Sequence, residues 1–313
     1  MRKRIIIIVA LFASVVEMAK AQMDVQFADY TSLKSYYNPA VSGTEGKLNV
    51  AGAYSMQMAG YDGAPATMFL SADMPIYFLS PRHGGGISFL NDMVGMFNTS
   101  KISLQYAFNM KLGLKSRIAI GANIGMISEK MDGSKLELED TTDPAFPTSS
   151  VSGNSLDFNF GVYYTMPRFW AGLSVMHASQ PTITASEKYE LEFARSYFFM
   201  AGGNISLKNS FLKLEPSCMV MSNFQTWRED VQCKVIYEYD GRKLYGGLGY
   251  SPGVSTTFMV GGDFHGATVG YSYQMFTSGI GMVNGSHELV VGYLTELDLF
   301  KKGRNKHKSV RWL

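Results

Sequence analysis

The sequence has few cysteines, little charge and, beyond its first residues, no long apolar run. Only 17% of its 313 residues are charged. A transmembrane helix needs about 18 or more consecutive apolar residues, and the lack of such a stretch after the N-terminus excludes a helical membrane protein. Cys218 and Cys233 are the only cysteines, which suits an exported protein but excludes a disulfide scaffold.

Patterns typical of metal sites, phosphate sites and catalysis are also missing. The histidines are His83, His177, His265, His287 and His307. They lie on separate predicted strands or turns with no second ligand at metal spacing, so we expect no metal and no cofactor. The glycine-rich residues 246–253 are not followed by a helix start that would hold a phosphate. Ser286, His287 and Glu288 would point to alternate faces of a strand and cannot form a triad among themselves, so we expect no enzyme.

The sequence has instead an alternation of apolar with small or polar residues, seen most clearly in residues 101–131. The apolar positions of the first arm are Ile102, Leu104, Tyr106, Phe108 and Met110. After a turn at residues 112–116 the pattern returns, which predicts a β-hairpin with one apolar face and one small or polar face. Each arm is long enough to cross a bilayer, which takes about 9 to 11 tilted residues.

Fourteen runs of this kind follow one another from Leu48 onward, with no amphipathic helix between them. They are residues 48–58, 66–79, 84–94, 99–111, 117–130, 154–166, 168–179, 194–207, 211–223, 227–239, 243–251, 255–264, 267–277 and 286–298. An even strand number, and short turns that alternate with long loops, are typical of bacterial outer-membrane barrels. The sequence therefore predicts an all-β fold, a transmembrane antiparallel up-and-down β-barrel of about fourteen strands. A soluble two-sheet sandwich is the alternative, but the many polar and small residues favour a water-compatible interior.

The alternation also predicts which side chains face lipid and which face the lumen. We expect Tyr106, Phe108, Ile120 and Ile124 toward lipid, and Gln105, Asn109 and Asn123 toward the lumen. Cys218 and Cys233 are a candidate cross-strand pair on the lipid-facing side, because the midpoint between them coincides with the turn near Gln225. Directly opposed Cβ atoms lie about 4.5 to 5.5 Å apart, slightly long for a relaxed disulfide, so we expect the two cysteines to be neighbours.

The two ends of the chain carry signals of their own. Residues 1–21 combine basic residues, an apolar run and a small-residue site, which predicts a signal peptide cleaved after Ala21 rather than a membrane anchor. We divide the rest into a periplasmic N-terminal segment (22–46), the barrel (47–299) and a basic periplasmic tail (300–313). The tail is either a solvated terminus or an electrostatic tether to anionic lipid or an acidic partner. The body before it is acidic, so we expect no nucleic-acid partner.

Several short motifs follow one another along the chain, at Asn38, Pro39, Ala40, Gly43, Gly63, Ala64, Pro65, Asp73, Asp92, Gly95, His287 and Glu288. In this order they resemble the PorP/SprF family of outer-membrane proteins of the Bacteroidota type IX secretion and gliding machinery. The resemblance implies a barrel that serves export, anchoring or surface display of secreted cargo with a C-terminal signal domain. It also implies secretion-machinery partners, often a periplasmic peptidoglycan-binding protein, and no catalytic residues.

Two other functions stay open beside this docking function. The first is a transport barrel for small hydrophobic or polar solutes, and the second is an enzyme, which would need an inward nucleophile within reach of a base. An open lumen, or a plug formed by residues 22–46, would favour transport. A lumen closed by the side chains of the wall would favour docking.

Overall fold

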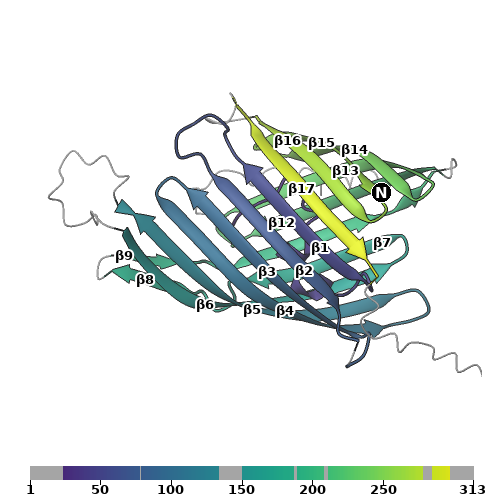
Figure 1. The fold of residues 1–313 in the computed structure, drawn as a ribbon, viewed down its shortest axis with the longest axis horizontal. Helices are drawn as coiled ribbons and strands as arrows, with labels where there is room; N and C mark the ends of the chain where they lie inside the picture. Colours follow the sequence, from purple (N-terminus) through teal and green to yellow (C-terminus); the bar gives the residue numbers. More distant parts are fainter. Residues whose placement is uncertain are drawn as a thin grey trace, which may run out of the picture.

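In the computed structural model the alternating runs form the antiparallel strands of one closed sheet (Figure 1). The structure describes residues 24–77, 79–133, 150–186, 189–207, 211–277 and 284–296. The predicted signal peptide and the basic tail therefore lie outside the described residues. Among those residues, no helix is long and apolar enough to cross a membrane.

The wall strands follow the predicted runs closely, with ends that differ by a few residues. The first seven are β1 (Leu48–Met56), β2 (Ala66–Pro75), β3 (His83–Val94), β4 (Phe97–Lys111), β5 (Arg117–Asp132), β6 (Ser150–Met166) and β7 (Phe169–Met176). The others are β10 (Ser196–Gly203), β11 (Ile205–Ser206), β12 (Leu212–Ser222), β13 (Trp227–Tyr239), β14 (Arg242–Ser251), β15 (Ser255–Phe264), β16 (Ala267–Phe276) and β17 (Ser286–Thr295).

Two pairings close the sheet into a barrel. β1 pairs with β17, and β12 pairs with both β10 and β11, which follow one another across Asn204 and together make one strand of the wall. The wall is thus a closed antiparallel barrel of 14 strands. This confirms the predicted fold class.

The two ends of the barrel differ in their connections. At one end, here called the short-turn end, residues 167–168, 240–241 and 265–266 each join two strands. At the opposite, long-loop end, β7 and β10 are separated by a segment that contains β8 (Thr182–Ser186) and β9 (Tyr189–Glu192). Ile183 of β8 is buried against Gly153 of β6, so this hairpin narrows the long-loop mouth.

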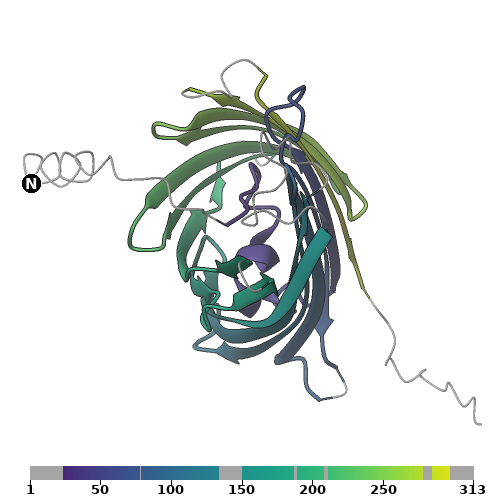
Figure 2. The same cartoon turned by 90° about the vertical axis from the view of Figure 1, so that its left-hand side faces the viewer.

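Residues 24–46, here called the plug, lie inside the barrel (Figure 2). The plug contains two short helical turns, α2 (Lys34–Tyr37) and η1 (Pro39–Val41). Its Tyr30 and Tyr37 are completely buried. The part of the predicted N-terminal segment (22–46) that the structure describes therefore packs within the lumen. A barrel of this strand number with small and polar inner residues is too wide for its own side chains to fill, so the N-terminal segment occupies the space.

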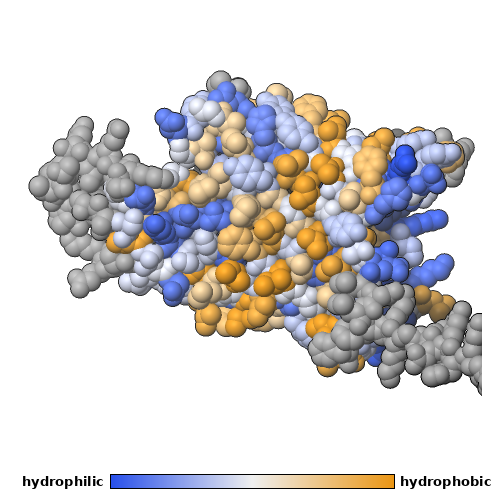
Figure 3. Space-filling view, in the orientation of Figure 1, coloured by the Kyte–Doolittle hydropathy of each residue, from blue (hydrophilic) through white to orange (hydrophobic). Residues whose placement is uncertain are grey.

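The outer face of the wall is apolar, whereas the inner face mixes polar and small residues with a group of apolar side chains. The side chain of Ile120 is 51% exposed on the outer face, whereas Asn123 is only 6% exposed and faces the lumen. Tyr106, Ile124 and Gln105 likewise lie on the predicted faces. Figure 3 shows hydrophobic residues over the middle of the wall and hydrophilic residues toward its two ends. This banding is typical of a membrane-spanning barrel.

The cysteine pair does not have the predicted register. Cys218 lies opposite Val231, and Cys233 lies opposite Pro216, so the cysteines are offset by two residues. Both are free and, as predicted, both point to the outer face. The turn that sets the register is residues 223–226, where the Asn223 carboxamide oxygen accepts hydrogen bonds from Gln225 N and Thr226 N. The turn centre therefore lies earlier than we assumed, and diagonal neighbours are about 7 to 8 Å apart.

Candidate functional site

The first plug residue joins a buried row of charged side chains in the long-loop half of the lumen. His177, which follows β7, contacts Asp24 of the plug through Nε2 (3.0 Å) and Asp157 of β6 through Nδ1 (3.1 Å). Lys101 of β4 donates to the other oxygen of Asp157. Buried charges are stable only when paired, so each charge in this row depends on the next. The row ties the start of the plug to the wall.

The electrostatics of this row favour a protonated histidine. Burial alone would lower the pKa of His177, but the Asp24 carboxylate, which is hydrogen-bonded to Nε2, and the Asp157 carboxylate beside Nδ1 raise it to about 9. Burial would raise the pKa of Asp24, but its interaction with His177 keeps the pKa below the usual value. At neutral pH the plug therefore starts at an imidazolium held between two carboxylates.

A second ionic anchor lies on the opposite part of the wall. Lys234 of β13 donates to Asp29 Oδ1 (2.6 Å) and Oδ2 (2.8 Å) of the plug. Glu288 of β17 accepts hydrogen bonds from Ala28 N (2.7 Å) and Asp29 N (2.8 Å). Gln232 donates to the carbonyl oxygen of Ala28. This part of the plug has its backbone groups and its charge satisfied by two strands of the wall, β13 and β17, with three strands between them.

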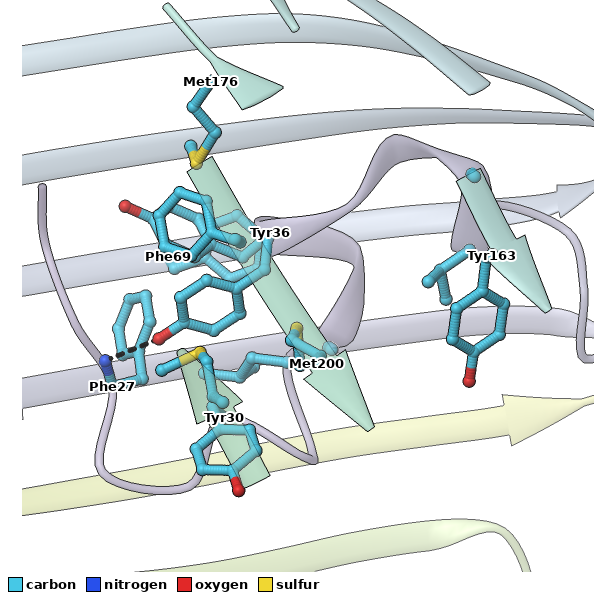
Figure 4. Packing of buried hydrophobic residues seen from close by; sticks show 14 of the residues in the cluster. Phe27, Tyr30, Tyr36, Phe69, Tyr163, Met176 and Met200 are labelled. Atoms are coloured by element: carbon cyan, nitrogen blue, oxygen red, sulfur yellow. Dashed lines mark hydrogen bonds between the residues drawn. The ribbon is translucent and has the colours of Figure 1, made fainter. Parts of the chain in front are cut away.

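Aromatic side chains of the plug and the wall form an apolar core within the lumen (Figure 4). Phe27 and Tyr36 pack edge to face, with ring centroids 5.1 Å apart. Tyr36 packs in the same way on Phe69 of β2, at 5.2 Å. Tyr37 packs on Phe198 of β10, and its hydroxyl accepts a hydrogen bond from Phe27 N (2.9 Å). Apolar side chains of the wall thus pack with those of the plug into one core within the lumen.

The Asn38 turn lies on a bed of wall glycines. Asn38 Nδ2 donates to the carbonyl oxygens of Val162 (3.0 Å) and Leu173 (3.2 Å), which belong to neighbouring strands. A Cβ atom at Gly161 would lie 2.1 Å from Asn38 Oδ1, and one at Gly121 would lie 2.4 Å from the Ala40 nitrogen. Only glycine allows the plug backbone to approach the wall this closely.

The last part of the plug is fixed near the short-turn end. Gly43 has φ +72°, and its N–H donates to Asp73 Oδ2 of β2 (2.7 Å). Ser42 donates to Gln105 Oε1 of β4 (2.7 Å). A Cβ atom at Gly84 would lie 2.0 Å from the carbonyl oxygen of Ser42. Wall and plug are therefore in backbone contact at this point too.

The motif positions separate into two groups in the structure. Plug and wall meet through Asn38, Pro39, Ala40, Gly43, Asp73 and Glu288. The other motif positions are Gly63, Ala64, Pro65, Asp92, Gly95 and His287. Gly95 N donates to Gly63 O across the long-loop end (3.0 Å), which brings two of these together. His287 lies on the outer face, where its Nδ1 is 2.6 Å from the Tyr271 hydroxyl. Glu288 is buried on the inner face, so the two neighbours point to opposite faces.

Sequence reasoning did not single out the charged anchors as site residues. Lys101, Asp157, His177, Lys234 and Asp29 are all buried and paired. The available signal was that Lys101, Asp157 and Lys234 occupy inward positions of strands, where a charge needs a partner. Periodicity does not say which residue that partner is.

Two of the cavities beside the plug lie toward opposite ends of the barrel. The long-loop cavity, of about 480 Å³, is lined by Asp24 and Tyr36 of the plug together with wall residues. The short-turn cavity, of about 360 Å³, is lined by Ser32 and Lys34 of the plug and by Lys243 among others. The two share no lining residue. Within the described parts of the chain, no group of three or more His, Cys, Asp and Glu could hold a metal ion.

The family follows from a match that spans plug and barrel. Residues 19–293 match the family model described as "Type IX secretion system membrane protein PorP/SprF". The chain belongs to the PorP/SprF family. This confirms the resemblance that the short motifs indicated, and with the barrel fold it places this PorP/SprF protein in the bacterial outer membrane. No curated protein matches the sequence.

Solved structures similar to this PorP/SprF protein are outer-membrane barrels. A FadL homologue of Pseudomonas aeruginosa is 13% identical, with a TM-score of 0.50 over 84% of this chain and 94% of that chain. A deltaS2S3 mutant of the TodX monoaromatic hydrocarbon channel is 11% identical, with a TM-score of 0.51 over the same shares of the two chains. At these identities the likeness shows the fold alone.

Proposed function

We propose that this PorP/SprF protein is a docking component of the type IX secretion machinery. It serves the export, anchoring or surface display of secreted cargo through protein–protein contacts at the two ends of the barrel. Secretion-machinery proteins and cargo with a C-terminal signal domain are the expected partners. A periplasmic peptidoglycan-binding protein is a further expected partner at the short-turn end.

The single observation that supports docking is the anchorage of the plug. Buried ionic contacts hold it at Asp24 and Asp29, and glycine-bed contacts hold it at Asn38. Releasing the plug would leave Lys234 without Asp29 and would take one of the two carboxylates away from His177, which is costly for buried charges. A barrel whose plug is fixed in this way offers partners a rigid surface.

The sharpest test locks the plug to the wall. Ser35 Oγ of the plug and Ser71 Oγ of β2 are 3.4 Å apart, so cysteines at both positions are within disulfide reach. The double variant, in a background with Cys218→Ser and Cys233→Ser, is expressed in cells and oxidised. Crosslinking in intact cells and purification of the barrel then report its partners, and surface labelling reports cargo display.

We expect the locked barrel to retain machinery partners and cargo display at the level of the Ser35→Cys single variant. The single variant is the matched control because it carries the same substitution without the link. Failure to recover any secretion-machinery protein with either variant would contradict the docking function.

Transport of small hydrophobic or polar solutes is the second candidate, and the plug itself is the observation that favours it. A plug formed by residues 22–46 is the arrangement expected of a transport barrel. A transport function requires the plug to move, so the disulfide lock should abolish solute uptake and reduction should restore it. Uptake that is equal in the locked and single-cysteine variants would contradict transport.

A further inference from the structure

The long-loop cavity has carboxylates that no cation in the described residues neutralises. Asp92 of β3 and Glu129 of β5 both line it, on either side of Thr99 of β4. Glu129 is only 2% exposed and accepts a hydrogen bond from Thr99. Asp92 accepts one from Thr67 (2.5 Å). A hydroxyl donor satisfies one lone pair of a carboxylate but does not balance its charge.

The cations that line the same cavity are already paired. Lys101 donates to Asp157, and His177 lies between Asp157 and Asp24. Neither cation therefore neutralises the negative charge of Asp92 and Glu129. The mouth of the cavity therefore has an uncompensated negative charge.

The deep end of the cavity has an unpartnered acceptor. Asn123 of β5 lines the cavity, is 6% exposed, and its Oδ1 has no hydrogen-bond partner among the described residues. Asp24 is also at this cavity, beside His177. Asn123 and Glu129 are six residues apart on one strand, so acceptors lie at both ends of a space about 20 Å long. Apolar side chains, including Leu90, Ile127 and Phe69, line the cavity as well.

We propose that the long-loop cavity binds a linear aliphatic polyamine, with one terminal ammonium between Asp92 and Glu129 and the other end at Asn123. Each terminal ammonium carries three donors and no acceptor, which suits carboxylate and amide oxygens. The methylene chain suits the apolar lining. This inference does not rest on the proposed docking function.

Calorimetric titration of the full-length barrel in a non-ionic detergent tests the proposal. The probes are spermine and cadaverine, whose single five-carbon chain has the same terminal groups but is too short to reach both ends. We expect spermine to bind at least tenfold tighter than cadaverine. Equal affinity for the two amines would overturn the proposal.

Two rim variants and one control locate the site. Glu129→Gln and Asp92→Asn keep the size of the side chain and remove its charge. Each should raise the dissociation constant of spermine about tenfold, because loss of one hydrogen bond to a charged group changes a dissociation constant by about tenfold or more. Asp263→Asn is the matched control, because Asp263 lines the short-turn cavity and accepts from Thr268 (3.2 Å). It should leave spermine binding unchanged. An equal loss in all three variants would show a general charge effect and overturn the assignment.

Two further measurements complete the test. The unfolding temperature of the Glu129→Gln variant should equal or exceed that of the parent protein, because the substitution removes an unbalanced buried charge.

A pentalysine peptide distinguishes binding of a free polyamine from binding of the lysine side chains of a polypeptide. Tighter binding of pentalysine than of spermine would overturn the assignment to a free polyamine.

Discussion

The outer and inner faces of the same strands obey different rules. On β5, Ile120 and Ile124 point outward and share only an apolar surface. Between them, Gly121 points inward and contacts the plug backbone at Ala40, and Asn123 lines a cavity. An outer position requires a class of residue, whereas an inner position often requires one particular residue with one particular partner. Substitutions on the two faces should therefore differ in size and in cause.

The largest effect should come from an inner ion pair. Lys234→Met leaves Asp29 buried without its cation, and loss of one member of a buried pair typically costs about 3 to 5 kcal/mol. Lys243→Met is the control, because Lys243 is exposed. Denaturant unfolding in detergent measures both. Equal stability of the two variants would contradict the importance of the inner pair.

A charge on the outer face should have the next largest effect. Ile120→Arg should destabilise the barrel in a bilayer by about 2 to 4 kcal/mol if the site is near the midplane. Asn123→Arg, three residues further along the same strand, should cost much less because its side chain enters the lumen. Folding into lipid vesicles along a denaturant series gives the comparison. Similar costs at both positions would argue against the assignment of the two faces.

A single methyl group tests the glycine bed. Gly161→Ala places a Cβ atom against Asn38 Oδ1, and overpacking of this kind costs about 1 to 3 kcal/mol. Gly246→Ala is the matched control, since a Cβ atom there meets no atom within 4 Å. The unfolding temperature of Gly161→Ala should lie below that of Gly246→Ala. In a double variant that also carries Asn38→Ala, the loss of stability caused by Gly161→Ala should be smaller. No reduction in the double variant would mean that the two positions act independently.

A change of pH should have the smallest effect on the inner face, because it changes only the protonation of side chains. The pKa of His177 is raised to about 9, so its stabilising contribution is complete below about pH 6.5 and is lost as the pH rises through about 9. The lowered pKa of Asp24 gives a contribution that is lost as the pH falls below its usual range. Protease cleavage near the plug should therefore increase above pH 9. The same pH dependence in a His177→Gln variant would contradict the role of the histidine.

What the sequence predicts well is the face of each strand, because a period of two fixes it locally. The fourteen runs, the short turns and the outward positions of Cys218 and Cys233 follow from that period. The cysteine register does not, because it depends on how Asn223 closes its turn. The plug is less predictable still. Asn38 was singled out by family resemblance, but its contact with Val162 joins residues that no local pattern connects.

The hydrogen bonds from Ala28 N and Asp29 N to Glu288 also set an order of events in folding. The first bond joins residues that are 260 positions apart in the sequence, and the second joins residues that are 259 positions apart. The start of the described chain is therefore bound by its last strand. Contacts of such long sequence separation slow folding, because the intervening chain loses its entropy before they form. A barrel assembled only as far as β16 lacks the carboxylate that receives this part of the plug. These two bonds to the plug therefore cannot form before β17 is in place.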